Sequence, residues 1–319
     1  MIKVPFGRPD ITKQEIQAVV KVLKNPILAH GPLSNKFEEL FAKFTGSRFA
    51  TTVSSCTAGM HLFYLANKIK KGDEVIVTSQ SHISTAHAIS LTGARPIFVD
   101  CNSSNGTIDS TKIEERITKK TRAITLVHHL GNPAEMGTIM KIARKHKLLV
   151  LEDCATALGA KINKTHVGNF GNVGVFSFYP IKHITTGEGG MFVSNDPELF
   201  EKVCVLNNHG RSTKEPRHFW PTDIGYKFKM SNIQAALGCA QLQRLDSLVK
   251  RKREILNFYK NFFKDYENIQ MNIEPNKTIN SSWMPTLFIQ REKEIRNGLL
   301  DCLKNINIDA RPTFWPLTS

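Results

Sequence analysis

Short apolar runs alternate with amphipathic segments through the first half of the chain. Five runs rich in β-branched and apolar residues predict strands: FATTVS (49–54), EVIVTS (74–79), RPIFVD (95–100), RAITLVHH (122–129) and LLVLED (148–153). Four segments between them have helical spacing: 57–69, 84–93, 110–117 and 136–147. Such alternation predicts βαβ units around a largely parallel sheet, whose apolar strands are covered by helices on both faces.

The flanking segments are mainly helical. Residues 5–25 predict an extended lead and a helix, with Thr12 as its N-cap and Glu15 completing a capping box. A second helix is expected over 35–46, another over 196–210, and a long, bent or divided one over 231–266. Beyond residue 268 a weaker strand pattern (281–289) and a helix (292–305) follow. We therefore predict a large domain of residues 1–245 and a smaller α+β domain of residues 246–319.

Composition narrows the class of protein. The chain has 319 residues, 41% of them hydrophobic, with neither a signal-peptide core nor an apolar run near the roughly 20 residues that span a bilayer. These features predict a cytoplasmic protein without a membrane segment. The six cysteines lack metal-ligand spacing, which predicts reduced thiols and no metal site.

The net charge of +15 leaves two interpretations open. It permits nucleic-acid binding, but the Lys and Arg residues are spread along the chain and no nucleic-acid-binding motif accompanies them. A basic surface equally suits a phosphate-bearing substrate. We expect a phosphate-bearing substrate. A non-catalytic regulatory or nucleic-acid-binding protein is the competing hypothesis.

The stretch VFSFYPIKHITTGEGGMFVSN (175–195) holds the main candidate for chemistry. Its two apolar runs predict strands, and the loop between them carries Lys182. Desolvation lowers the pKa of a lysine and makes its amine nucleophilic. A solvated loop lysine is the simpler interpretation of Lys182 alone.

Other candidates fall at predicted strand ends, where ligands bind in open α/β sheets. SSCTAGMH (54–61) places Ser55 and Thr57 at a strand-to-helix junction, which can cradle a phosphate or simply cap the helix. Asp153 ends a buried strand and needs a partner. A lysine, a buried carboxylate and a phosphate cradle together are what pyridoxal phosphate requires.

The chain also resembles the DegT/DnrJ/EryC1/StrS sugar aminotransferases, which are fold-type I pyridoxal phosphate enzymes. The resemblance covers nearly the whole chain and lies in 54–61, 72–89, 93–100, 151–160, 173–191 and 225–245, most specifically in FSFYPIKHITTGEGGM. It implies a mainly parallel sheet flanked by helices and a smaller C-terminal domain. Because members of the family continue past IDARPTFWPLTS, that domain is expected to be incomplete.

Site roles follow from the resemblance. Lys182 would hold the cofactor aldehyde and move the proton, and Asp153 would pair with the ring nitrogen. His82 stands where the family has an aromatic residue on the ring, and Thr156 where it has His or Gln. The resemblance assigns the cofactor phosphate to Thr57, Ala58 and Ser177. Lys227, where many members have Asn, would reach the partner's cofactor phosphate across a homodimer with a shared active site.

The resemblance also implies the reaction. Members with this lysine transfer an amino group, whereas a dehydratase branch has histidine there. The expected reaction moves an amino group from glutamate to a nucleoside-diphosphate ketosugar, either 4-keto-6-deoxy or 3-keto, with Arg311 as a substrate contact. Two further interpretations stay open. The acceptor is a cyclitol or another ketone, or the protein is an inactive homologue that binds the cofactor without turnover.

Overall fold

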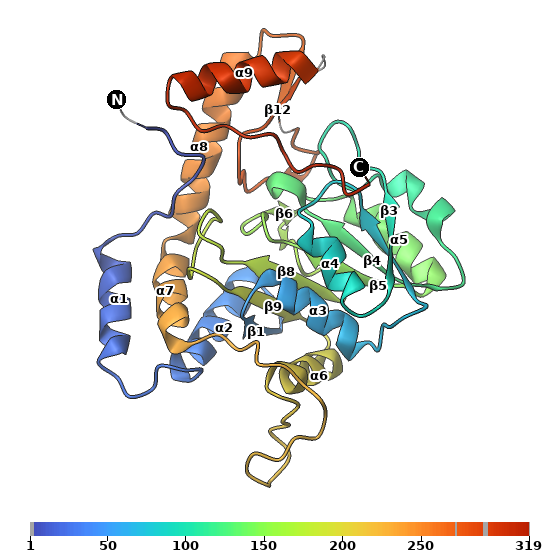
Figure 1. The fold of residues 1–319 in the computed structure, drawn as a ribbon, viewed down its shortest axis with the longest axis vertical. Coiled ribbons are helices and arrows are strands. Elements are labelled where there is room, and N and C mark those ends of the chain that lie inside the picture. Colours follow the sequence, from blue (N-terminus) through green and yellow to red (C-terminus); the bar gives the residue numbers. More distant parts are fainter. Residues whose placement is uncertain (1–2, 272, 290–292, 319) are drawn as a thin grey trace.

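A seven-stranded sheet forms the centre of the computed structural model, which describes residues 3–271, 273–289 and 293–318 (Figure 1). Its order is β1-β9-β8-β5-β4-β2-β3. The strands are β1 (Phe49–Val53), β2 (Glu74–Thr78), β3 (Arg95–Val99), β4 (Thr121–Val127), β5 (Leu149–Asp153), β8 (Val173–Ser177) and β9 (Gly190–Ser194). Only β9 runs against the others in this sheet, because it pairs antiparallel with both β1 and β8. The predicted, largely parallel sheet is confirmed.

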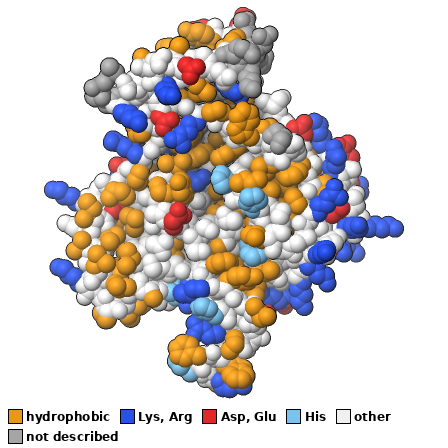
Figure 2. Space-filling view, in the orientation of Figure 1, with side chains coloured by type: hydrophobic (Ala, Val, Ile, Leu, Met, Phe, Trp, Pro, Cys, Tyr) orange, Lys and Arg blue, Asp and Glu red, His pale blue; other side chains and the backbone are white. Residues whose placement is uncertain are grey.

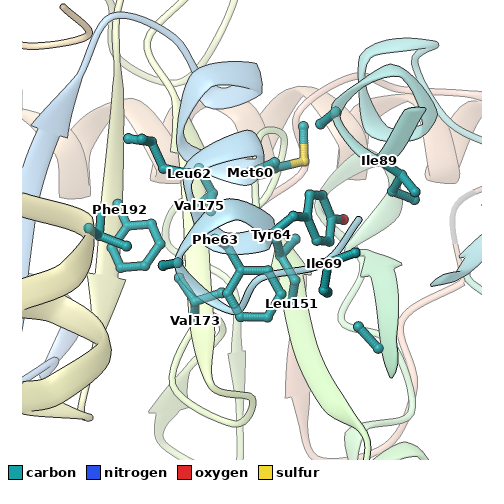
Figure 3. Packing of buried hydrophobic residues seen from close by; sticks show 14 of the residues in the cluster. Met60, Leu62, Phe63, Tyr64, Ile69, Ile89, Leu151, Val173, Val175 and Phe192 are labelled. Carbon is teal, nitrogen blue, oxygen red and sulfur yellow. The ribbon is translucent and has the colours of Figure 1, made fainter. Parts of the chain in front are cut away.

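Alternate side chains of each strand enter opposite cores. Val75 and Val77 pack with α3 (Cys56–Ala66), α4 (Ser84–Ser90) and α6 (Pro197–Asn207), as part of the cluster drawn in Figure 3. Ile76 faces the other side, toward α5 (Met136–His146). The neighbouring part of that second side is covered by α2 (Pro32–Thr45) and α7 (Asn232–Gln243). This two-residue period is what strands buried on both faces require.

Most expected helices are present, with one correction. Helix α1 (Lys13–Leu23) begins with the predicted capping box: Thr12 accepts from Gln14 N, and Thr12 N donates to Glu15. The helix predicted over 110–117 is wrong, since two short 3-10 turns, Ser110–Lys112 and Glu114–Arg116, occupy this segment. Asp109 bonds Thr111 locally, and Ile117 is already extended. So few residues cannot repay the cost of a helix nucleus.

The expected long helix is divided at Arg244, between α7 and α8 (Leu245–Phe263). Beyond α8, β10 (Ile269–Met271) pairs with β12 (Leu287–Ile289), and α9 (Lys293–Asn305) follows. β11 (Thr278–Ile279) joins the hairpin of β6 (Lys161–Ile162) and β7 (Thr165–His166). The boundary between residues 245 and 246 stays a prediction.

The strand expected over 281–289 is confirmed only at Leu287–Ile289. The preceding residues 280–284 are buried but not paired as a strand. Ser282 has a left-handed backbone (φ 59°), and Pro285 offers no amide to a ladder. This segment instead bonds the 128–132 loop, through Ser281 N to Gly131 O at 3.2 Å and Trp283 N to Leu130 O at 3.2 Å.

The terminal segments lie together. Val4 N donates to Asn307 O at 3.0 Å, and Asp309 N donates to Val4 O at 2.9 Å. From α9 the chain runs back over the main body toward β3 (Figure 1), where Leu317 N donates to Ser79 O at 2.8 Å. The C-terminal residues thus reach the carboxyl end of β2. Within the described ranges, no helix combines the length and apolar character needed to cross a membrane.

Candidate active site

The two central candidates lie near the carboxyl ends of neighbouring strands. Asp153 is the last residue of β5, which runs parallel to β8 with Asp153 opposite Val175. Lys182 lies in the loop that joins β8 to β9. This loop is held across its base, because Phe178 N donates to Gly189 O and Thr186 N donates to Phe178 O, both at 3.0 Å. The sheet therefore fixes both groups in one region.

Buried donors surround the Asp153 carboxylate. Thr85 on α4 donates its hydroxyl to Oδ2 at 2.9 Å, and Ala155 N donates to Oδ1 at 3.0 Å. The Cys56 thiol, at the start of α3, lies 3.8 Å from Oδ1. Because the one proton of Thr85 goes to the carboxylate, Ser81 must donate in the 2.7 Å contact between the two hydroxyls. Such a shell stabilises an ionised, well-oriented carboxylate.

Lys182 is desolvated. Burial lowers the pKa of its amine, while the charge of Asp153 acts in the opposite direction. The Nζ atom lies 4.4 Å from the centroid of the Trp283 ring. Lys182 is thus half-buried rather than fully solvated, and its lowered pKa leaves a larger share of the amine neutral than in an exposed lysine.

The expected phosphate end combines a helix N-terminus with the end of β8. Gly190 pairs with Val53 on one side and with Ser177 on the other, so α3 starts beside Ser177. A Cβ at Gly190 would lie 2.7 Å from Cys56 N, which shows how closely helix and sheet approach. Ser55 is the N-cap, since its hydroxyl accepts from Ala58 N at 3.1 Å.

These contacts qualify the three predicted phosphate ligands. Thr57 and Ser177 are both partly exposed, Thr57 in the first turn of α3. The amide of Ala58 already donates to Ser55, so an anion would have to share it. The first-turn amides and the helix dipole still favour an anion at this position.

His82 and Arg311 line one hollow of about 600 Å³. The His82 ring accepts from or donates to Ser84 Oγ at 2.8 Å and meets Phe314 edge-on at 5.6 Å. Partial desolvation and the Lys182 charge lower the pKa of this ring. Arg311 is exposed, pairs with Asp309 at 2.9 Å and lies over the Phe6 ring at 4.9 Å.

Two further predicted residues, Thr156 and Lys227, have contacts of their own outside the Lys182 loop. Thr156 is buried, and its hydroxyl donates to His128 O at 3.1 Å. Lys227 is exposed in a segment that pairs with Asn208, and its charge acts on His30 and Lys229 instead.

Sequence reasoning missed Trp283, Thr85 and Phe314. Trp283 and Phe314 come from the C-terminal region, and no local pattern indicates their position. Thr85 lies in the recognised segment 72–89, where a hydroxyl one helical turn after Ser81 was a usable signal.

A neighbouring polar cluster has a structural explanation. His128, Glu152 and Cys154 place potential ligand atoms within 4.8 Å of one another. Glu152 accepts from the amides of Gly168, Phe170 and Gly171, each at 2.7 Å, and His128 Nε2 lies 2.9 Å from it. The carboxylate is thus fully occupied by the protein, as expected of a structural buried charge.

The residues present fit pyridoxal phosphate. A desolvated amine, a buried carboxylate held by donors and a helix N-terminus close to a glycine lie around the strand ends. The chemistry of this set matches the aldehyde, the ring nitrogen and the phosphate respectively.

Comparison with known proteins gives consistent results. The model of the DegT/DnrJ/EryC1/StrS aminotransferase family matches residues 9–319. The GDP-perosamine synthase of Escherichia coli O157:H7 is 39% identical over 318 residues, covering 98% of this chain and 85% of that protein.

Two solved structures show the same architecture. Helicobacter pylori PseC, an aminotransferase involved in the biosynthesis of pseudoaminic acid, is 30% identical with a TM-score of 0.93, covering 99% of this chain and 86% of that one. The Escherichia coli GDP-4-keto-6-deoxy-D-mannose-3-dehydratase with bound hydrated PLP is 28% identical with a TM-score of 0.91, covering 98% and 86%. Because a dehydratase shares the architecture, the residues of the site must decide the reaction.

Proposed function

The chain belongs to the DegT/DnrJ/EryC1/StrS aminotransferase family, and we propose that it moves an amino group from glutamate to a 4-keto-6-deoxy sugar carried on a nucleoside diphosphate. The relatives establish the general activity: the protein is a pyridoxal phosphate-dependent sugar aminotransferase. The amino donor and the keto-deoxy acceptor are the proposed part.

The half-buried Lys182, whose amine interacts electrostatically with Asp153, is the observation that carries amino transfer. Residue 182 is a lysine, where the resemblance places histidine in dehydratases. Its lowered pKa favours a neutral amine, which can attack a carbonyl and later accept a proton. An imidazole at this position could accept a proton but could not form the same covalent link to an aldehyde.

Each cofactor contact has a proposed owner. Lys182 would hold the aldehyde, Asp153 the ring nitrogen, and Thr57, Ala58 and Ser177 the phosphate, with His82 against the ring. When bound, the cofactor supplies a ring that withdraws electrons from the carbon bearing the transferred amino group. Thr85 and Ala155 both donate to Asp153 and so orient its carboxylate, which would face the ring nitrogen.

Lys182 moves the proton of the reaction. With the cofactor bound, its neutral amine would take a proton from the donor's α-carbon, hold it at Nζ and release it again, and in the second half-reaction it would supply a proton to the sugar carbon that receives the amino group. The base of the loop is tied to Phe178 and Gly189, so the amine returns to one place in each half.

The substrate side rests on the relatives and on the hollow beside His82. A GDP-perosamine synthase at 39% identity makes GDP-linked ketosugars the first to test. Arg311 supplies a cation at this hollow, and the net charge of +15 suits a diphosphate. In Figure 2 the Lys and Arg side chains are scattered over the face shown rather than joined in one patch, which suits a small anion better than a nucleic acid.

A homodimer would complete the phosphate end. Lys227 is exposed, as expected if it serves the partner's cofactor phosphate. The loop between α6 and α7 that precedes it projects from the body (Figure 1) and exposes Phe219, Trp220 and Ile224. Light scattering measures the oligomeric state, and a strict monomer with full activity would remove this part of the proposal.

Product analysis tests the function. The protein loaded with pyridoxal phosphate is incubated with glutamate and a GDP-, UDP- or dTDP-linked 4-keto-6-deoxy sugar, and aminosugar and 2-oxoglutarate are measured by mass spectrometry. We expect both products in equal amounts from one nucleotide sugar. Turnover of 3-keto sugars or a cyclitol ketone alone would replace the proposed acceptor. Loss of the sugar hydroxyl without amination would make the protein a dehydratase.

A further inference from the structure

Trp283 reaches the site from the C-terminal region and is fixed there. Only 4% of its surface is exposed. Its Nε1 donates to Ile181 O at 2.8 Å, and its backbone amide donates to Leu130 O at 3.2 Å. Because Ile181 immediately precedes Lys182, the same loop carries the amine and holds the ring that the amine contacts.

The Lys182 ammonium lies over the face of this ring. The distance of 4.4 Å from Nζ to the ring centroid is within the roughly 6 Å range of a cation–π contact. Such a contact is strongest where water is excluded, and burial lowers the pKa of this lysine. The indole face therefore stabilises the protonated amine against the cost of desolvation.

Other groups around the amine act in both directions. Asp153 on β5 favours the ammonium, and so does a thiolate at Cys56 on α3, although burial keeps that thiol protonated. The facing cationic or titratable groups are His82 before α4, His183 in the same loop and Lys252 on α8, whose Nζ donates to Trp283 O at 3.1 Å. Among these neighbours, Trp283 favours the ammonium without carrying a charge.

We propose that Trp283 is a positioning residue that holds the Lys182 amine whenever this amine is not bonded to the cofactor. The inference rests on the proposed role of Lys182. During each half-reaction the free amine needs a fixed place from which to accept and return one proton. The indole provides this place and keeps the protonated form accessible. Loss of the indole face leaves the amine less basic and free to adopt other rotamers.

Titration of Lys182 tests the proposal without measuring activity. Wild type, Trp283→Leu and Trp283→Phe are loaded with pyridoxamine 5′-phosphate, a form in which the lysine is not bonded to the cofactor. An uncharged, amine-reactive reagent is added over a range of pH values, and the rate at which it modifies Lys182 is followed by peptide mass spectrometry. We expect the pKa of Lys182 to fall by about one unit in Trp283→Leu. Trp283→Phe, which keeps an aromatic face, should lie between the two.

Two comparisons separate this effect from a general disturbance. Trp220→Leu removes an exposed indole that stacks on Arg217 at 4.1 Å, and it should leave the titration of Lys182 unchanged. An unchanged or raised pKa in Trp283→Leu, with Tm lowered or not, overturns the proposal. If the Leu variant does not fold, Trp283→Phe alone decides by the direction of its shift.

A different experiment tests the proposed function itself. Borohydride reduction of the pyridoxal phosphate form followed by peptide mapping places the trapped cofactor on one lysine. A label on another lysine would refute the role of Lys182. A label on Lys182 together with a titration that does not respond to Trp283 would refute only the positioning role.

Discussion

The two sides of the site are built differently. We call Asp153, Thr85 and Lys182 the strand-end floor, and residues 280–284 with 309–317 the C-terminal wall. The floor lies near the ends of adjacent strands or on the helix beside them; Thr85 and Asp153 are buried and bond each other, and Lys182 is half-buried. The wall is packed onto it from distant sequence and includes exposed residues, such as Trp315 at 62% and Arg311. The floor fits one cofactor, whereas residues 309–317 of the wall, which include exposed side chains, are free to vary with the substrate.

The largest expected effect is at the floor. Lys182→Ala removes both the covalent attachment and the proton carrier, so the visible absorption band of the lysine-bound cofactor disappears and kcat falls by at least about 10²- to 10⁴-fold. Absorbance spectra and product assays measure both. Lys112→Ala, at an exposed lysine paired with Asp100, serves as the control and should behave as wild type. A surviving band would show that another lysine holds the cofactor.

Thr85→Val tests whether the floor depends on the orientation of its carboxylate. The substitution keeps the side-chain shape but removes the donor to Asp153 Oδ2. A hydrogen bond to a charged group contributes about 1.5–3 kcal/mol, so cofactor affinity should fall by about 10- to 100-fold. Thr85→Ser should restore most of it. Equal dissociation constants for the Val and wild-type proteins, from absorbance titrations, would contradict this account.

Acid should weaken the contact between the loop that carries Lys182 and the C-terminal wall. His183 Nε2 donates to Ser281 O at 3.0 Å, its Nδ1 is buried without a partner, and burial lowers its pKa to about 3. Its neutral form is therefore required by the fold, while the unfolded chain takes up a proton near the ordinary value of 6.5. The contribution is complete above about pH 6.5 and is lost at about 1.4 kcal/mol per pH unit as pH falls toward about 3.

Urea unfolding between about pH 7.5 and about pH 4.5 measures this slope. His129 and His166, whose pKa values burial lowers to about 4, act in the same direction, while the raised pKa of buried Glu38 acts against them. His183→Gln should reduce the pH dependence of the unfolding free energy by the amount that corresponds to the uptake of one proton. An identical slope in this variant would mean that His183 does not titrate on unfolding.

The smallest effect is expected at the wall. Arg311→Ala should raise KM for the nucleotide sugar by about tenfold and leave kcat and the cofactor band unchanged, because the contact would serve binding alone. Its pairing with Asp309 is exposed, so Tm should not change measurably. Arg122→Ala, at the amino end of β4, is the matched control. A drop in kcat would show that Arg311 acts on the reacting groups and not on binding alone.

The sequence indicates the floor much better than the wall. Strand runs, helix caps and the ends of strands are local patterns, and they predict the sheet, the position of Asp153 and the loop of Lys182. Homology supplies the expected role of His82, and the structure does place its ring beside the hollow. The expected helix over 110–117 fails because charged residues can satisfy a helical period without burying enough apolar surface.

The wall depends on contacts between segments that no local pattern connects. Trp283 pairs with Leu130 and Ile181, far away in the chain, and Phe314 meets His82 through the pairing of residues 316–317 with 79–80. The place near the cofactor that the motif suggests for Thr156 stays a prediction; the structure adds a hydrogen bond from its hydroxyl to the backbone of His128, which no local pattern indicates.

The pairing of Val4 with residues 307–309 gives the molecule a clasp that is independent of its central sheet. Two backbone hydrogen bonds close it, and the residues that line the hollow follow immediately on the C-terminal strand of the clasp. Fluctuations that release so few bonds cost far less than unfolding the sheet. Mild denaturation or stretching of the chain should therefore abolish the discrimination between sugars first. The visible absorption band of the bound cofactor should persist at that point.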